Sequence, residues 1–155
     1  MSEKHIPSAT ITDSYLQVDP PLVSVVMPAY NAENHIARSL RSILAQTYRN
    51  FEIIVVDDGS SDDTEGVVRA TAPDAVYVRI KNSGPAAARN EGNTHASGKY
   101  LAFLDADDLW HPRKLELQVE YLERHPDINA VYCMWCVMFP GDTDIDWNEK
   151  QVFDE

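Results

Sequence analysis

Three carboxylates lie close together in the chain, directly after an apolar segment. Asp105, Asp107 and Asp108 follow residues 100–104, which have the apolar character of a strand. Carboxylates this close repel one another, so burying them is costly without a cation. Hard divalent ions such as Mg2+ or Mn2+ prefer oxygen ligands and complete their shell with water and substrate phosphates. The spacing is typical of a divalent metal site, and also of a solvated turn in which Asp108 caps a helix.

Two further polar loops contain residues suited to binding a nucleotide. Asp57 and Asp58 follow the apolar run 51–56, and an Asp at the end of a strand accepts hydrogen bonds from a ribose or a base. Arg89 follows a stretch of small residues, and its permanently charged guanidinium pairs with phosphate or with surface acids. Taken singly, a capped loop explains the acids and a surface ion pair explains the arginine.

The segments that must position these residues alternate between strand-like and helix-like patterns. Apolar runs predict strands at 22–27, 51–56, 75–80, 100–104 and 130–139. Helical spacing and helix-starting residues predict helices at 32–46, up to residue 70, between 85 and 98, and from 112 onward. This alternation predicts an α/β fold, a mainly parallel sheet with helices on both faces. In such sheets ligands bind beyond the carboxyl ends of the strands, which is where the polar loops fall.

The charge balance limits the partners of the chain. Its 155 residues include 25 acids against 13 Lys plus Arg, a formal net charge of −12. Such a surface repels nucleic acids and anionic membranes, so we expect neither as a direct partner. A phosphate-bearing ligand would need a local positive charge, for which a divalent cation is the obvious source. The length fits one domain, and the 44% of hydrophobic residues are typical of a globular protein.

The two ends of the chain differ from its middle. Residues 1–20 are polar and mixed, which predicts a flexible leader rather than a secretory signal. No apolar run approaches the roughly 20 residues that span a bilayer. We therefore expect a cytoplasmic location, with any membrane association through a region outside this chain. The acidic stretch 141–155 does not resemble the end of a compact domain, so we expect the fold to be incomplete in this chain.

Several familiar site motifs are absent from the sequence. It has no glycine-rich dinucleotide or ATP-binding loop, no paired histidines at helical spacing and no serine nucleophile motif. Cys133 and Cys136 lie on the predicted strand 130–139, where residues three apart face opposite sides. We therefore expect buried free thiols there, not a zinc site or a redox pair.

Five segments, in order and with short gaps, together resemble the family 2 glycosyltransferases with the Rossmann-like GT-A fold. They are VSVVMPAYN at 23–31, SILAQTY at 42–48, FEIIVVDDGSSD at 51–62, NSGPAAARNEG at 82–92 and GKYLAFLDADD at 98–108. The resemblance covers about 21–139. It implies a nucleotide-sugar-binding portion at 21–140, with 141–155 an acidic tail or the start of an acceptor-binding half.

The resemblance also implies roles for individual residues. Tyr30 would stack near the base of the nucleoside, Asp58 would read the edge of a uracil, and Arg89 would lie near the diphosphate. Asp105 would bind the nucleotide and the metal, and Asp107 would be the more direct metal ligand. The remaining residues expected to line the nucleoside are Pro28, Ala29 and Asn31.

The reaction implied by the family is transfer of a sugar from a nucleotide diphosphate donor, such as a UDP-sugar, with inversion. Mn2+ or Mg2+ would act as a Lewis acid on the leaving diphosphate, and a carboxylate would deprotonate the acceptor hydroxyl. In this family that general base lies beyond the position of Glu155, so no catalytic residue is assigned. The acceptor, a glycan, lipid or protein, is not specified by the sequence.

Two other hypotheses fit parts of the pattern. A non-catalytic module could keep the fold to bind a nucleotide or a protein partner without the downstream base. A signalling receiver domain also places acids after a strand, but it needs a later Lys at the end of a strand. Beyond Lys114 the sequence offers only Lys150, in the acidic stretch.

Overall fold

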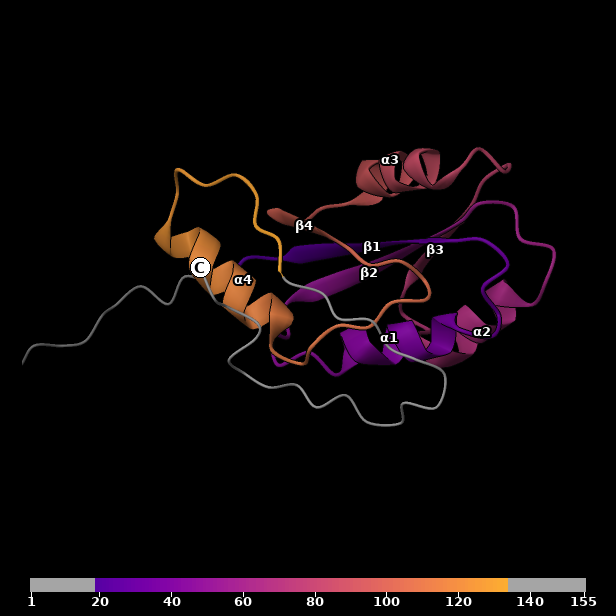
Figure 1. The fold of residues 1–155 in the computed structure, drawn as a ribbon, viewed down its shortest axis with the longest axis horizontal. Coiled ribbons are helices and arrows are strands. Elements are labelled where there is room, and N and C mark those ends of the chain that lie inside the picture. The colour runs from indigo at the N-terminus through magenta and orange to yellow at the C-terminus, as the bar shows by residue number, and fades with distance from the viewer. Residues whose placement is uncertain (1–18, 134–155) are drawn as a thin grey trace, which may run out of the picture.

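The computed structural model describes residues 19–133, and within them it has a parallel sheet with helices on both faces (Figure 1). The elements in chain order are β1 (Val23–Ala29), α1 (Ile36–Leu44), β2 (Phe51–Asp57), α2 (Thr64–Thr71), β3 (Val76–Arg79), α3 (Pro85–His95), β4 (Tyr100–Phe103) and α4 (Lys114–Arg124). The predicted α/β architecture is confirmed.

The strands lie in the order β3-β2-β1-β4, and every neighbouring pair is parallel. All seven residues of β1 are buried, as expected for a central strand with helices on both sides. The chain moves outward from β1 through β2 to β3 and then returns to the other side of β1 for β4. The strand order therefore reverses between β1 and β4, which is where open α/β sheets bind their ligands.

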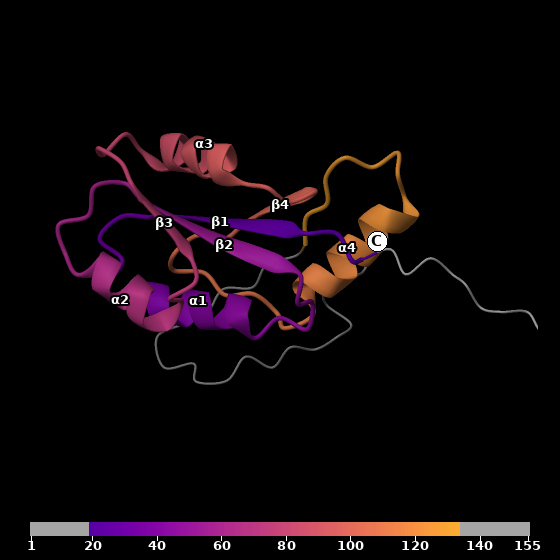
Figure 2. The same ribbon diagram turned by 180° about the vertical axis from the view of Figure 1, so that it is seen from behind.

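Two apolar layers enclose the sheet. Alternate residues of β1, such as Val25 and Met27, pack with α1, α2 and α4 in the larger core. Val26 points the other way, toward α3, which covers the opposite face of the sheet from α1 and α2 in both views (Figures 1 and 2). Gly92 lets α3 approach closely, because a Cβ there would lie 2.3 Å from Val26 Cγ1.

The predicted element boundaries need two corrections near the amino-terminal end. The first strand continues through Pro28 to Ala29 instead of ending at residue 27. A proline is tolerated here because of the side to which its backbone points. Successive residues of a strand direct their backbone groups to opposite sides, so Pro28 faces β4. It lies beyond the last β1–β4 pair at Val26, where its missing N–H is not needed for pairing. The helix predicted from residue 32 begins only at Ile36. Residues 33–35 form a turn, and the N–H groups of Ala32 and Glu33 bond to Thr64 and Asp62.

The predicted strand at 130–139 is wrong for the part that the structure describes. Residues 130–133 form no strand, and Tyr132 is 96% exposed. Cys133 is free but only partly buried, whereas Cys136 lies outside the described residues. Residues 1–18 of the predicted leader 1–20 and the segment 141–155 also lie outside them. Among residues 19–133, no helix has the length and hydropathy needed to cross a membrane.

Candidate functional site

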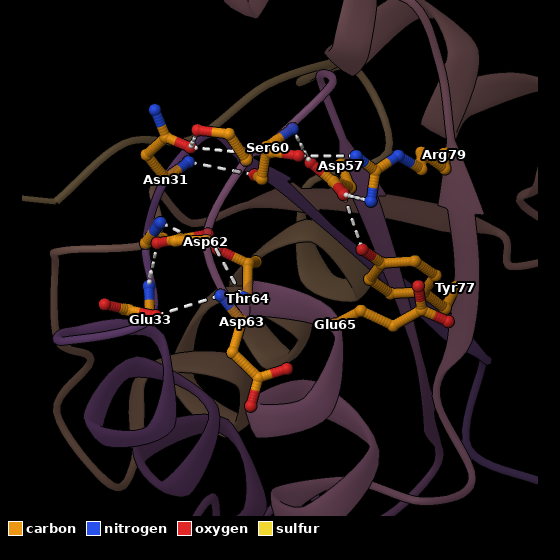
Figure 3. Close-up of polar contacts among 12 residues, drawn as sticks. Asn31, Glu33, Asp57, Ser60, Asp62, Asp63, Thr64, Glu65, Tyr77 and Arg79 are labelled. Atoms are coloured by element: carbon orange, nitrogen blue, oxygen red, sulfur yellow. Dashed lines mark hydrogen bonds and ion pairs between the residues drawn. The ribbon is translucent and has the colours of Figure 1, made fainter.

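The polar loops predicted from the sequence lie at one edge of the sheet. Because all four strands are parallel, the loops after β1, β2, β3 and β4 leave the same edge. Hydrogen bonds join the loop after β1 to the loop after β2 (Figure 3). Another joins the loop after β2 to the start of α3. An ion pair then joins α3 to the loop after β4. The sheet thus brings together residues that lie about 75 positions apart in the sequence.

Asp57, the last residue of β2, organises the base of its loop. Its carboxylate has no exposed surface and accepts hydrogen bonds from the Ser60 backbone N–H at 2.7 Å and the Tyr77 hydroxyl at 2.6 Å (Figure 3). Arg79 Nη1 lies 3.2 Å from Asp57 Oδ2. Burial alone would raise the pKa of Asp57, but these hydrogen bonds and the charge of Arg79 outweigh it, so the pKa is lowered. Asp57 is therefore a charged structural residue, in line with the capped-loop alternative that the sequence offered for these acids.

Asp58 joins the loop after β2 to the start of α3. Its two carboxylate oxygens accept hydrogen bonds from the backbone N–H groups of Ser83 and Gly84, at 2.7 and 2.8 Å. Its own N–H donates to the Ala29 carbonyl at 2.8 Å. A carboxylate oxygen has two lone pairs, so these bonds leave acceptor capacity for a base. The predicted contact of Asp58 with a uracil remains a prediction.

Glycine is required at two points of this junction. Gly84 has φ 90°, in the region that side chains rarely adopt, and its N–H is one of those held by Asp58. Gly59 has φ 78°, and a Cβ there would lie 2.9 Å from the Asn82 nitrogen. The loops after β2 and β3 therefore approach each other backbone to backbone.

The residues predicted to line a nucleoside lie at the end of β1 and at the start of the loop that follows it. Pro28 and Ala29 are buried within β1 itself, so they are not loop residues. Tyr30, the first residue after β1, is 54% exposed. Asn31 has φ 47°, a left-handed conformation that Asn tolerates better than most residues. Contact of these four residues with a nucleoside remains a prediction.

Arg89 and Asp105 form an ion pair between α3 and the loop after β4. Both side chains remain partly exposed. The pair places the predicted diphosphate-binding cation directly beside the predicted metal-binding acids. An incoming phosphate could share Arg89 with Asp105, because a guanidinium has five N–H donors.

The loop after β4 is anchored through its apolar residues while its acids face outward. Ala106 is buried between Asp105 and Asp107, and its carbonyl accepts a hydrogen bond from the Ser39 hydroxyl at 2.7 Å. Burial, followed by the charges of Asp107 and Asp105, raises the pKa of Asp108. Carboxylate oxygens are the type of ligand that a hard divalent cation prefers.

The residues that hold this loop come from α1 and the turn after it, and they were not predicted as functional. They are Ser39 and Ser42 on α1 and Gln46, two residues past its end. The Ser42 hydroxyl accepts the Trp110 N–H at 3.2 Å. Gln46 is fully buried, donates to the His111 carbonyl at 2.7 Å and accepts the Leu115 N–H at 3.0 Å. The sequence signal that could have identified these residues is their spacing, which places polar residues at helical intervals on an otherwise apolar face.

Protein ligands alone do not complete a metal site in the part of the chain that the structure describes. No group of three His, Cys, Asp or Glu residues there has the arrangement to hold a metal ion. This is compatible with Mg2+ or Mn2+, which typically take one or two carboxylates and complete their shell with substrate phosphates and water.

Comparison with known sequences gives a consistent result. The family model of glycosyl transferase family 2 matches residues 24–152. An uncharacterized glycosyltransferase of Rickettsia conorii is 45% identical over 105 residues, covering 66% of this chain and 17% of that protein. A UDP-Glc:alpha-D-GlcNAc-diphosphoundecaprenol beta-1,3-glucosyltransferase of Escherichia coli is 43% identical over 117 residues, 74% of this chain and 46% of its own. The chain thus spans less than half the length of these relatives.

Comparison with solved structures agrees with the fold. S. aureus TarS 1-349 in complex with UDP aligns with a TM-score of 0.64 at 29% identity, covering 67% of this chain and 32% of that one. A mannosyltransferase from Pyrobaculum calidifontis in complex with GDP-Man and Mn2+ aligns with a TM-score of 0.62 at 32% identity, covering 81% and 38%. These neighbours are GT-A glycosyltransferases.

Proposed function

Because the chain belongs to glycosyl transferase family 2, we propose that it binds a UDP-sugar with the help of a divalent cation and presents the sugar for transfer to an acceptor hydroxyl. The observation that carries the proposal is the Arg89–Asp105 pair, which brings a cation and the acidic loop together at the edge where Asp58 and Tyr30 also lie. Family membership excludes the receiver-domain hypothesis.

The nucleoside end of the proposed site lies over β1 and β2. Tyr30 offers an exposed aromatic face for stacking on the base. Asp58, whose N–H bonds to the Ala29 carbonyl next to Tyr30, retains acceptor capacity on its carboxylate. That TarS has been solved with UDP, and that the E. coli relative is named as a UDP-Glc-dependent enzyme, supports uridine as the nucleoside.

The phosphate end of the proposed site lies over β4. Asp107 and Asp105 would hold Mn2+ or Mg2+, and Arg89 would contact the diphosphate. A cation bound there would supply positive charge to the phosphate oxygens that leave with the nucleotide. The Mn2+ present with GDP-Man in the Pyrobaculum neighbour supports a metal of this class.

The proposed reaction breaks the bond between the anomeric carbon and the diphosphate and forms a bond to the acceptor oxygen, with inversion. The acceptor hydroxyl loses its proton to a general base, and we assign that role to no residue of 19–133. We propose the acceptor only by its class, which is a hydroxyl group of a glycan, a lipid or a protein.

Calorimetric titration of UDP into the 155-residue chain tests this proposal. We expect Mn2+ to tighten UDP binding by about tenfold or more, and we expect Asp107→Ala to remove that gain. Asp74→Ala is the matched control, because Asp74 is an exposed acid in the loop before β3, at the opposite edge of the sheet. A UDP affinity that changes neither with Mn2+ nor with Asp107→Ala would refute the site assignment.

A further inference from the structure

The loops after β1 and β2 bond to each other through backbone N–H groups on both sides (Figure 3). The Asn31 N–H donates to the Ser60 hydroxyl at 2.9 Å, and the Ser61 N–H donates to Asn31 Oδ1 at 2.8 Å. This pair of bonds holds Asn31 in its left-handed conformation, at the residue that directly follows Tyr30.

Glu33 and Asp62 repeat the same reciprocal arrangement. The Glu33 N–H donates to Asp62 Oδ2 at 3.0 Å, and the Asp63 N–H donates to Glu33 Oε2 at 2.9 Å. Each carboxylate thus accepts a backbone donor of the opposite loop. The backbone N–H of Glu33, which precedes α1, is satisfied by the opposite loop in this contact.

Thr64 is the buried centre of the contact. Its hydroxyl accepts the Ala32 N–H at 2.8 Å and donates to Asp62 Oδ1 at 2.5 Å. The side chain has no exposed surface, so a hydroxyl lost here would leave the Ala32 N–H without its partner away from water. We refer to Asn31, Glu33, Asp62 and Thr64 as the inter-loop network.

The network fixes the backbone on one side of Tyr30, and Asp58 fixes it on the other. The Ala29 carbonyl, just before Tyr30, accepts the Asp58 N–H. Tyr30 therefore stands on a backbone that is held at both neighbours, although its ring is exposed. A ring whose backbone is already ordered loses less conformational freedom when a ligand stacks on it, and preorganisation of this kind increases affinity.

We propose that Thr64 and Asp62 are positioning residues for nucleoside binding, which act by holding the backbone under Tyr30. Neither residue needs to touch the nucleotide. The inference rests on the proposed function, because it assumes that Tyr30 stacks on the base of UDP.

Thr64→Val and Thr64→Ser form the matched pair that tests the inference. Valine keeps the shape and removes the hydroxyl, whereas serine keeps the hydroxyl. UDP affinity is measured by calorimetry below the melting temperature of each variant. We expect Thr64→Val to weaken UDP binding by about tenfold and Thr64→Ser to change it by less than about twofold.

The same pair in a Tyr30→Ala background separates positioning from a general structural role. If Thr64 acts through Tyr30, Thr64→Val should cost less than about twofold in UDP affinity once the ring is removed. A variant that lowers the melting temperature but leaves UDP affinity unchanged would overturn the inference. An equal loss of affinity with and without the ring would overturn it as well.

Asp62→Asn keeps the test decisive if Thr64→Val does not fold. Asparagine keeps one side-chain oxygen as an acceptor and has an NH2 group in place of the other, so one backbone donor loses its partner. We therefore expect about threefold weaker UDP binding, and we expect this loss to depend on Tyr30 as well. Unchanged affinity in this variant overturns the inference. Failure of the unmodified chain to bind UDP would instead refute the proposed function, and with it this inference.

Discussion

The two ends of the candidate site are built in opposite ways. At the nucleoside end, the loops after β1 and β2 are bonded to each other, and Asp57 and Asp58 are buried with their carboxylates engaged by neighbouring donors. At the phosphate end, the loop after β4 is held from beneath through Ala106 and Trp110, while Asp107 and Asp108 stay exposed.

This difference separates Asp57, an acid that maintains the fold, from Asp107 and Asp108, whose exposed side chains are available to a ligand. A buried carboxylate with several donors is stabilised in its charged form, whereas crowded carboxylates with few donors repel one another. We therefore expect the nucleoside end to be formed before the ligand arrives. The phosphate end should be completed by the cation and the diphosphate.

The largest expected effect comes from removing Asp57. Asp57→Ala leaves the Ser60 N–H and the Tyr77 hydroxyl without their acceptor, and we expect it to lower the free energy of unfolding by about 3 kcal/mol. Asp107→Ala should leave stability within about 0.5 kcal/mol, since it removes an exposed charge from a repelling group. Urea unfolding of both variants measures the contrast, and equal losses would remove the distinction drawn between the two ends.

A second prediction isolates the anchor of the phosphate end. Gln46→Leu removes the bonds to the His111 carbonyl and the Leu115 N–H, at an expected cost of about 2 kcal/mol in the free energy of unfolding. We also expect it to reduce the gain in UDP affinity that Mn2+ provides, while the affinity for uridine stays unchanged. An equal loss of uridine affinity in calorimetry would mean that the two ends are not independent.

The smallest expected effect is the pH dependence of the nucleoside end. The pKa of Asp57 is lowered by hydrogen bonds and Arg79 in spite of its burial, so its carboxylate stabilises the fold above the unfolded pKa of about 3.9. That contribution is lost as the pH falls through the lower, folded pKa. The difference in stability between the wild type and Asp57→Asn should therefore shrink below about pH 4, and a gap that widens there would contradict this assignment.

The strands and the polar loops could be predicted because their signals are local. The apolar run of β2 is read directly from adjacent residues, and so is the Pro85 start of α3. In parallel sheets the carboxyl ends share one edge, so the convergence of Asp58 and Asp105 on that edge also followed from the alternation of strands and helices.

The contacts between loops could not be predicted, because they join residues that are distant in the sequence. Asn31 and Ser60 are 29 positions apart, and Ser39 and Ala106 are 67 apart. Helical periodicity placed residue 32 within a helix, yet α1 begins at Ile36, and the N–H of Ala32 bonds to Thr64. The apolar run after residue 129 likewise matched a strand, although residues 130–133 form none.

The most direct test of this account compares uridine with UDP, each titrated into the chain with and without Mn2+. A preformed nucleoside end and a phosphate end completed by the cation predict that Mn2+ tightens UDP by about tenfold or more and changes uridine by less than about twofold. A metal effect of equal size on both ligands, or none on UDP, would contradict it.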